Sequence, residues 1–237
     1  MTRSTPSSPS SRDSGPPPAQ LLVMARYPSP GSVKTRLASQ IGAEAAWRLY
    51  DAFVRDLSDR LEALELPLTW AFWPPDAPFQ TLMPGTRCIP QMGGDLGERL
   101  EHAVGECFDA VPAPVIVIGV DSPHLDLARV REAADALGAG VDVVLGPALD
   151  GGYYLIGLRA PSAVVFRGIT WGSSSVLDTT LSRAREAGLR AQLLEPTFDV
   201  DDAGGLRALR AVLSRGEVDL PRTRAVLALL VDAPGAP

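Results

Sequence analysis

Residues 114–125 read PVIVIGVDSPHL, and this stretch decides the fold that the sequence predicts. Its apolar, mostly β-branched side chains follow one another without polar alternation, which is typical of a strand covered on both faces, as in a parallel sheet. The run ends at Asp121, and Ser122-Pro123 stops the strand. A carboxylate at the carboxyl end of a central parallel strand lies where open α/β sheets bind ligands. Asp121 could equally cap the next helix, and the stretch alone leaves both interpretations open.

Strand-like and helix-like segments alternate on both sides of this stretch, so the sequence predicts an α/β fold with a mostly parallel central sheet. Further strands are expected at 21–25, 68–73, 87–90, 141–145, 153–158 and 192–194. Helices are expected at 35–57, 95–108, 127–137, 173–186, 203–213 and 222–231.

The composition predicts one domain over residues 20–231. Residues 1–19 are rich in serine and proline and are expected to form a loose tail, as are residues 232–237. The net charge of −6 argues against a nucleic-acid partner. The two cysteines lie far apart and have no metal-ligand spacing, so a reducing compartment, the cytoplasm, is expected. No apolar run approaches the ~20 residues of a membrane span.

The loop 28–36 follows the first expected strand and opens a helix. Backbone amides at a helix N-terminus attract phosphate, and Lys34 and Arg36 add positive charge there, which favours a phosphate site. The loop has neither the P-loop pattern nor the dinucleotide fingerprint. The alternative is an ordinary Pro-Gly turn with two solvated cations, although cations in the first helical turn oppose the helix dipole.

Carboxylates form a second group of candidates. Asp121 ends the central strand, and Asp199, Asp201 and Asp202 lie between the last strand and a helix. Mg²⁺ binds carboxylate oxygens together with substrate phosphates. If Asp121 and Asp201 converge, the pair could therefore hold a metal. Helix capping is the alternative role for Asp201 and Asp202.

The segment Asp150-Gly151-Gly152-Tyr153 is a strong turn signal. Its glycines allow close approach of a ligand, and Asp150 could bind a hydroxyl group or act as a base. A plain hairpin turn explains the segment as well. Trp171 could stack on a sugar or a base, or could simply pack in the core.

Taken together and in this order, the motifs resemble a known family. They are MARYPSPGSVKTRL, QMGGDLGERL, VIGVDSPHL, DVVLGPALDGGYYLIGL, ITWGSSSVL and DVDDAGGL. This pattern resembles the small prokaryotic glycosyltransferases with a Rossmann-like GT-A fold. That family belongs to the nucleotide-diphospho-sugar transferase superfamily, which includes the molybdenum-cofactor and phospholactate guanylyltransferases. The resemblance covers about residues 21–213.

The resemblance implies roles for individual residues at three sites. It implies a nucleotide-phosphate site at Arg26, Gly31, Lys34 and Arg36, and a site for Mg²⁺ or Mn²⁺ at Asp121, Asp201 and Asp199. It implies a sugar or acceptor side at Gly151, Gly152, Tyr153 and Trp171, with Asp150 and Asp121 as catalytic carboxylates. The proline-containing segment 26–31 departs from the glycine-rich first loop of the superfamily.

Three functions follow as expectations. The first is a metal-dependent glycosyltransferase that moves a sugar from a nucleotide-sugar donor to a small acceptor. The second is a guanylyltransferase-like nucleotidyltransferase that releases pyrophosphate, because both reactions need charge stabilisation on nucleotide phosphates. The third is a nucleotide-binding protein without catalysis. The expected partners are the nucleotide and the acceptor, and a homodimer is left open.

Overall fold

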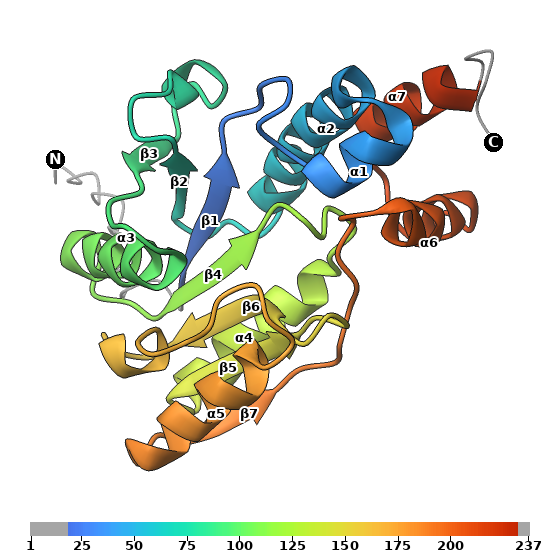
Figure 1. Cartoon of the computed structure of the whole chain (residues 1–237). Coiled ribbons are helices and arrows are strands. Elements are labelled where there is room, and N and C mark those ends of the chain that lie inside the picture. The colour runs from blue at the N-terminus through green and yellow to red at the C-terminus, as the bar shows by residue number, and fades with distance from the viewer. Residues whose placement is uncertain (1–18, 232–237) are drawn as a thin grey trace, which may run out of the picture.

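The computed structural model describes residues 19–231, which build one seven-stranded sheet with helices on both faces (Figure 1). The strand order is β3-β2-β1-β4-β6-β5-β7, and β6 runs antiparallel to both of its neighbours while the other pairs are parallel. The predicted α/β class with a mostly parallel sheet is therefore confirmed. The strands are β1 (Gln20–Arg26), β2 (Leu68–Trp73), β3 (Arg87–Pro90), β4 (Val115–Gly119), β5 (Val143–Pro147), β6 (Tyr153–Leu158) and β7 (Ala191–Leu193).

The central strands bury side chains on both faces, as the apolar run predicts. Leu21 and Ile116 belong to a core that lies under α1, α2, α4, α6 and α7, whereas Leu22 and Val117 belong to a second core under α3 and α5. The helices are α1 (Thr35–Ile41), α2 (Ala43–Glu62), α3 (Leu96–Ala110), α4 (Leu127–Gly138), α5 (Val176–Glu186), α6 (Ala203–Ser214) and α7 (Pro221–Val231), with short 3₁₀ turns at Phe79–Thr81 and Ala163–Val165.

The single helix predicted at 35–57 is wrong, because the chain forms two helices there. Gly42 lies between α1 and α2 with φ of 88°, a conformation that a residue with a side chain rarely adopts. The four-residue apolar period continues across this break, so periodicity alone could not reveal it.

The predicted loose tails lie outside the described residues, except for Ala19. Ala19 was predicted to belong to the first tail, but its side chain is buried in the core. No helix within residues 19–231 is long and apolar enough to cross a membrane.

A buried carboxylate fixes α7 against α2. Asp56 accepts hydrogen bonds from the backbone amides of Arg222 (3.1 Å) and Thr223 (2.8 Å). Its side chain is fully buried, and it caps the first turn of α7 from a neighbouring helix.

We expect Asp56→Ala to lower the free energy of unfolding by about 2–3 kcal/mol, because the mutation leaves buried amide donors without acceptors. Urea denaturation measures the loss. Asp59→Ala is the matched control, since Asp59 pairs with the same Arg222 but is exposed, and its loss should stay below about 1 kcal/mol. Equal losses in the two variants would contradict the capping role.

Candidate active site

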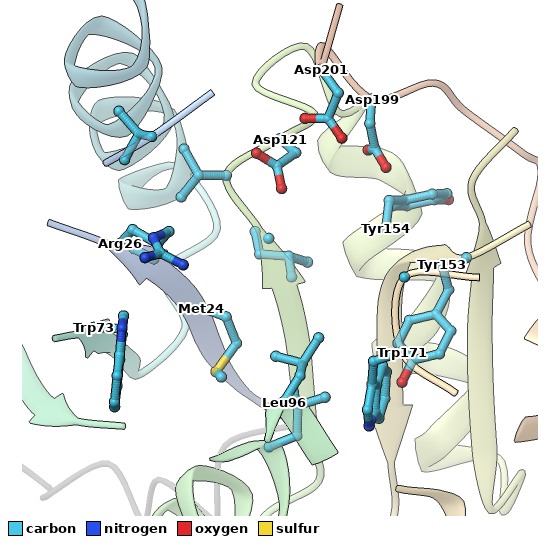
Figure 2. Close-up of a pocket in the computed structure, with 18 of the residues that line it drawn as sticks. Met24, Arg26, Trp73, Leu96, Asp121, Tyr153, Tyr154, Trp171, Asp199 and Asp201 are labelled. Atoms are coloured by element: carbon cyan, nitrogen blue, oxygen red, sulfur yellow. The ribbon is translucent and has the colours of Figure 1, made fainter. Parts of the chain in front are cut away.

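A cleft of about 540 Å³ lies where β1 and β4 end and β6 begins. Figure 2 shows Arg26 and Trp73 on one side of it and Tyr153 and Trp171 on the other. Asp121, Asp199 and Asp201 lie at one end of the cleft (Figure 2). The reversed direction of β6 brings the start of that strand, rather than its end, to the cleft.

Lys34 bridges Asp121 and Asp201, two carboxylates that are far apart in the sequence. Its Nζ donates to Asp121 Oδ1 and, at 2.7 Å, to Asp201 Oδ1. The Lys34 side chain is only 3% exposed, whereas those of Asp121 and Asp201 are 50% and 43% exposed. The structure thus brings Asp121 and Asp201 together, with Lys34, which was predicted in the phosphate site, between them. The ammonium is held between carboxylates, so it does not stand open to solvent as a free phosphate ligand.

Burial is the largest single influence on the pKa of Lys34 and lowers it. The charges and hydrogen bonds of Asp121 and Asp201 together raise the pKa by more, so that it lies above the usual lysine value. Lys34 precedes α1 with φ of 50°, in the left-handed region that only a few non-glycine residues adopt. Such backbone conformations cluster at functional sites.

Backbone and side-chain bonds fasten the two carboxylate segments to each other. The amide of Val200 donates to the carbonyl of Asp121 at 2.8 Å. Ser122 Oγ donates to the carbonyl of Phe198 at 2.9 Å and to the carboxylate of Asp199. The loop after β4 and the loop before α6 therefore form one rigid edge of the cleft.

Aspartates close to Asp121 and Asp201 in the sequence cap the two following helices. Asp202 caps α6 by accepting from Gly205 N at 3.0 Å, and Asp126 caps α4 by accepting from Ala128 N at 2.9 Å. Asp121 and Asp201 are therefore available to the cleft.

Asp199 is partly buried beside the other carboxylates. The pKa of Asp199 is raised to about 6, mainly by burial. The hydrogen bond from Ser122 lowers this pKa, whereas the negative charges of Asp121, Asp201 and Asp150 raise it further. Four carboxylates and one ammonium thus make this end of the cleft strongly negative.

Three arginines, Arg26, Arg36 and Arg99, line the cleft and supply positive charge there. Arg26 and Arg36 line it, both are exposed, and neither forms an ion pair with any carboxylate among residues 19–231. Gly31, which was predicted in the phosphate site, is exposed with φ of 77° and does not line the cavity, although Arg26 before it and Ser32 after it do.

The opposite wall contains the predicted acceptor-side residues. Asp150 accepts a hydrogen bond from Gly152 N at 2.9 Å, so it shapes the hairpin turn and also lines the cleft. Gly151 has φ of 92°, and a side chain there would collide with the carbonyl of Ser174. Gly151 itself does not line the cavity, but it lets the Trp171 segment pack against the turn.

Sequence reasoning missed several residues of the cleft. Tyr50 from α2 accepts a hydrogen bond from the amide of Arg26 at 2.9 Å. Arg99 stacks over the ring of Trp73, with 3.7 Å between the guanidinium carbon and the ring centroid. Gln91 donates to the carbonyls of Ala25 and Ala71 and so ties β1 and β2 at this edge. Tyr50 and Arg99 lie in helices and Gln91 directly follows β3. Gln91 and Arg99 belong to the motif QMGGDLGERL, but their contacts depend on tertiary structure.

The carboxylates of the cleft fit a divalent cation that arrives with a phosphate group. Within residues 19–231 no three Asp, Glu, His or Cys side chains are grouped to hold a metal by themselves. Mg²⁺ is commonly bound by one or two carboxylates together with substrate phosphates. Asp121 and Asp201 are half-exposed and point into the cleft, and so fit that mode rather than an all-protein site.

His124 contacts the segment that leads to Asp199 at the same edge of the cleft. Its Nε2 lies 3.1 Å from Thr197 Oγ1, and its ring stacks on Phe198 with centroids 3.9 Å apart. Burial, with a smaller contribution from the charge of Arg60, lowers the pKa of His124 to about 4. The folded protein therefore holds this imidazole neutral.

We expect His124 to favour folding increasingly as the pH rises from 4 to 6.5. In this range the unfolded chain binds a proton on the imidazole and the folded chain does not, so the stabilisation is complete above pH 6.5 and is lost toward pH 4. The shift corresponds to about 3 kcal/mol. The difference in unfolding free energy between wild type and His124→Phe, which keeps the ring stack, measures it. A difference that is constant from pH 4 to pH 7 would contradict the buried neutral imidazole.

Comparison with known proteins places this geometry in a family. A family model described as an uncharacterised protein conserved in bacteria (DUF2064) matches residues 61–173. The solved structure of a "putative nucleotide-diphospho-sugar transferase" from Desulfovibrio desulfuricans G20 is 34% identical, with a TM-score of 0.80 over 90% of this chain and 97% of that chain. The chain belongs to this nucleotide-diphospho-sugar transferase family.

Two more distant solved structures are also similar. A 4-diphosphocytidyl-2C-methyl-D-erythritol synthase is 13% identical with a TM-score of 0.52, over 82% of this chain and 97% of that chain. A cytidylyltransferase from Leptospira borgpetersenii serovar Hardjo-bovis is 9% identical with a TM-score of 0.50, over 90% and 94%. At these identities the likeness shows the shared fold alone. No curated protein sequence matches the chain.

Proposed function

We propose that the protein is a metal-dependent glycosyltransferase that moves a sugar from a nucleotide-sugar donor to the hydroxyl group of a small acceptor. The observation that carries the proposal is the meeting of Asp121, Asp201 and Lys34 at the carboxyl edge of the sheet, in a cleft that three arginines also line. Membership of the nucleotide-diphospho-sugar transferase family supports it.

Each wall of the cleft has its own task in this reaction. Arg26 and Arg36 bind the donor's phosphates through charge-assisted hydrogen bonds. Asp121 and Asp201, with Asp199 beside them, hold the divalent cation, Mg²⁺ or Mn²⁺, which when bound would neutralise charge on the departing nucleoside diphosphate.

The acceptor binds at the opposite wall, beside Tyr153 and Trp171. The bond between the sugar carbon and the diphosphate oxygen breaks, and a bond forms from that carbon to the acceptor oxygen. Asp150 takes the proton that the acceptor hydroxyl loses. Asp150 is exposed and lines the cleft, so it can reach an acceptor without rearrangement of the core.

A thermal-shift screen of UDP-, GDP-, ADP-, CDP- and dTDP-sugars, each with and without Mn²⁺, identifies the donor, because a ligand that binds the folded state raises its apparent stability. Release of nucleoside diphosphate from that donor in the presence of alcohols then tests transfer. The proposal fails if no nucleotide sugar stabilises the protein with metal.

Nucleotidyl transfer is the second candidate. The three arginines that line the cleft, Arg26, Arg36 and Arg99, place enough positive charge there to bind the several negative charges of a nucleoside triphosphate. In that reaction a nucleoside triphosphate is consumed and pyrophosphate is released. An assay for pyrophosphate against nucleoside diphosphate separates the two reactions directly.

A further inference from the structure

Lys34 is the only lysine in the chain, although Lys and Arg together number 22. Every other basic side chain of these two types is therefore an arginine. The two are not interchangeable, because the ammonium is a compact charge with three donors, whereas the guanidinium is a wide planar fork. At Lys34 the compact group fits between one oxygen of Asp121 and one of Asp201.

The surroundings of Lys34 keep its ammonium in this place. The side chain is 3% exposed, and Nζ lies 6.0 Å from the ring centroid of Phe53, itself fully buried. Within residues 19–231, Asp121 and Asp201 are its two hydrogen-bond acceptors. A buried ammonium that loses its carboxylate partners is strongly destabilised.

A divalent cation would need the same carboxylate oxygens of Asp121 and Asp201 that accept hydrogen bonds from Lys34. A cation that arrives alone would have to compete with the ammonium for Asp121 and Asp201, and Lys34 would then be left buried beside a like charge. A nucleotide changes this balance because its phosphate oxygens are new acceptors for the ammonium. Arg26 and Arg36 lie in the same cleft to attract those phosphates.

We propose that Lys34 is the resident counter-ion of Asp121 and Asp201 and keeps a divalent cation off them until phosphate oxygens are available to its ammonium. The metal and the nucleotide then bind together, and the metal does not bind first. This inference rests on the metal site of the proposed function and adds the order in which that site is filled.

The first test measures binding of Mn²⁺ alone, from the electron paramagnetic resonance signal of free Mn²⁺, to the full chain without nucleotide. Lys34→Met keeps the length of the side chain next to Phe53 and removes the charge, so we expect it to bind Mn²⁺ at least tenfold more tightly than wild type. Arg48→Met is the matched control, because it removes one positive charge from an exposed pair with Glu44 on α2 and should bind as wild type does.

Equal affinity of wild type and Lys34→Met for Mn²⁺ overturns the inference but leaves the proposed transferase standing, since the donor screen tests that separately. Absence of Mn²⁺ binding to Lys34→Met overturns the inference, and the donor screen with and without Mn²⁺ then decides separately whether the metal site of the proposed function stands. If Lys34→Met does not fold, Lys34→Gln replaces it, because its amide can still donate to one carboxylate.

The second test uses wild-type protein, because a single lysine gives a single signal after labelling with ¹³Cε-lysine. Mg²⁺ alone should leave this resonance in place, and Mg²⁺ with inorganic pyrophosphate should shift it. A shift produced by Mg²⁺ alone, or no shift with Mg²⁺ and pyrophosphate together, overturns the inference.

Discussion

Asp121→Asn is expected to lower turnover of the nucleotide donor about 10²–10³-fold while the protein stays folded. The substitution keeps the shape of the side chain but removes the charge that pairs with Lys34 and that would hold the proposed metal, and electrostatic groups of this kind contribute factors of this size to catalysis. The asparagine oxygen can still accept a hydrogen bond from Lys34, and Asp201 still neutralises the ammonium, so the protein should lose some stability but stay folded. Release of nucleoside diphosphate and the thermal midpoint measure the two effects.

Asp202→Asn is the matched control for this prediction. It removes a carboxylate one residue from Asp201 but preserves the cap of α6, because asparagine caps helices as well as aspartate does. Its turnover should equal that of wild type. A similar loss of turnover in both variants would mean that the overall negative charge of the loop matters and the particular position of Asp121 does not.

Asp199→Asn is expected to stabilise the fold by about 2 kcal/mol at pH 7. The folded protein raises the pKa of Asp199 to about 6, so the folded state resists the ionisation that the unfolded chain undergoes freely near pH 4. This cost is complete above pH 6 and disappears as the pH falls to 4. An asparagine can still accept the hydrogen bond from Ser122 but carries no charge to bury.

Urea denaturation at pH 4 and pH 7 checks this expectation. The variant should be more stable than wild type at pH 7 and equal to it near pH 4, and its turnover should fall, as is common when a strained active-site group is relaxed. Asp109→Asn on the exposed end of α3 is the control and should change neither value. A variant that is less stable than wild type at pH 7 would contradict the assignment.

Asp199 and His124 affect the pH dependence of stability in opposite directions. Between pH 4 and pH 6 the histidine increases stability as the pH rises, whereas Asp199 decreases it. The two contributions are similar in size, so wild type should show a flatter profile in this range than either single variant.

The sequence predicted the strands of the fold well because each is short, apolar and bounded by turn residues. The stretch 114–120 contains β4 (Val115–Gly119), which is covered on both faces, and the segment after Asp150 returns as β6. The break at Gly42 was missed because its apolar period does not change there. The antiparallel direction of β6 follows from its short hairpin to β5.

The candidate site was predictable in part, because strand ends of a parallel sheet meet at one edge. That rule brings Asp121 near the loop of Lys34, and the motif order added Asp201. What the sequence could not show is that Lys34 is buried between these two carboxylates. Nor could it show that Asp202 caps the helix while Asp201 is available, since two adjacent aspartates offer the same local pattern. The contacts of Tyr50, Gln91 and Arg99 depend on tertiary packing and have no local signal.

The reversed strand β6 has a consequence for how this scaffold diversifies. The turn at residues 148–152 reaches the cleft because β6 starts there. The half of the cleft that contains Asp121, Asp201 and Lys34 is built from the ends of β1 and β4, the loop after β1 and the loop before α6. The two halves are thus encoded by separate stretches of chain. Exchange of that one hairpin tip between relatives is expected to alter which alcohol is accepted while donor recognition is inherited unchanged, which makes the hairpin the natural place to begin redesign.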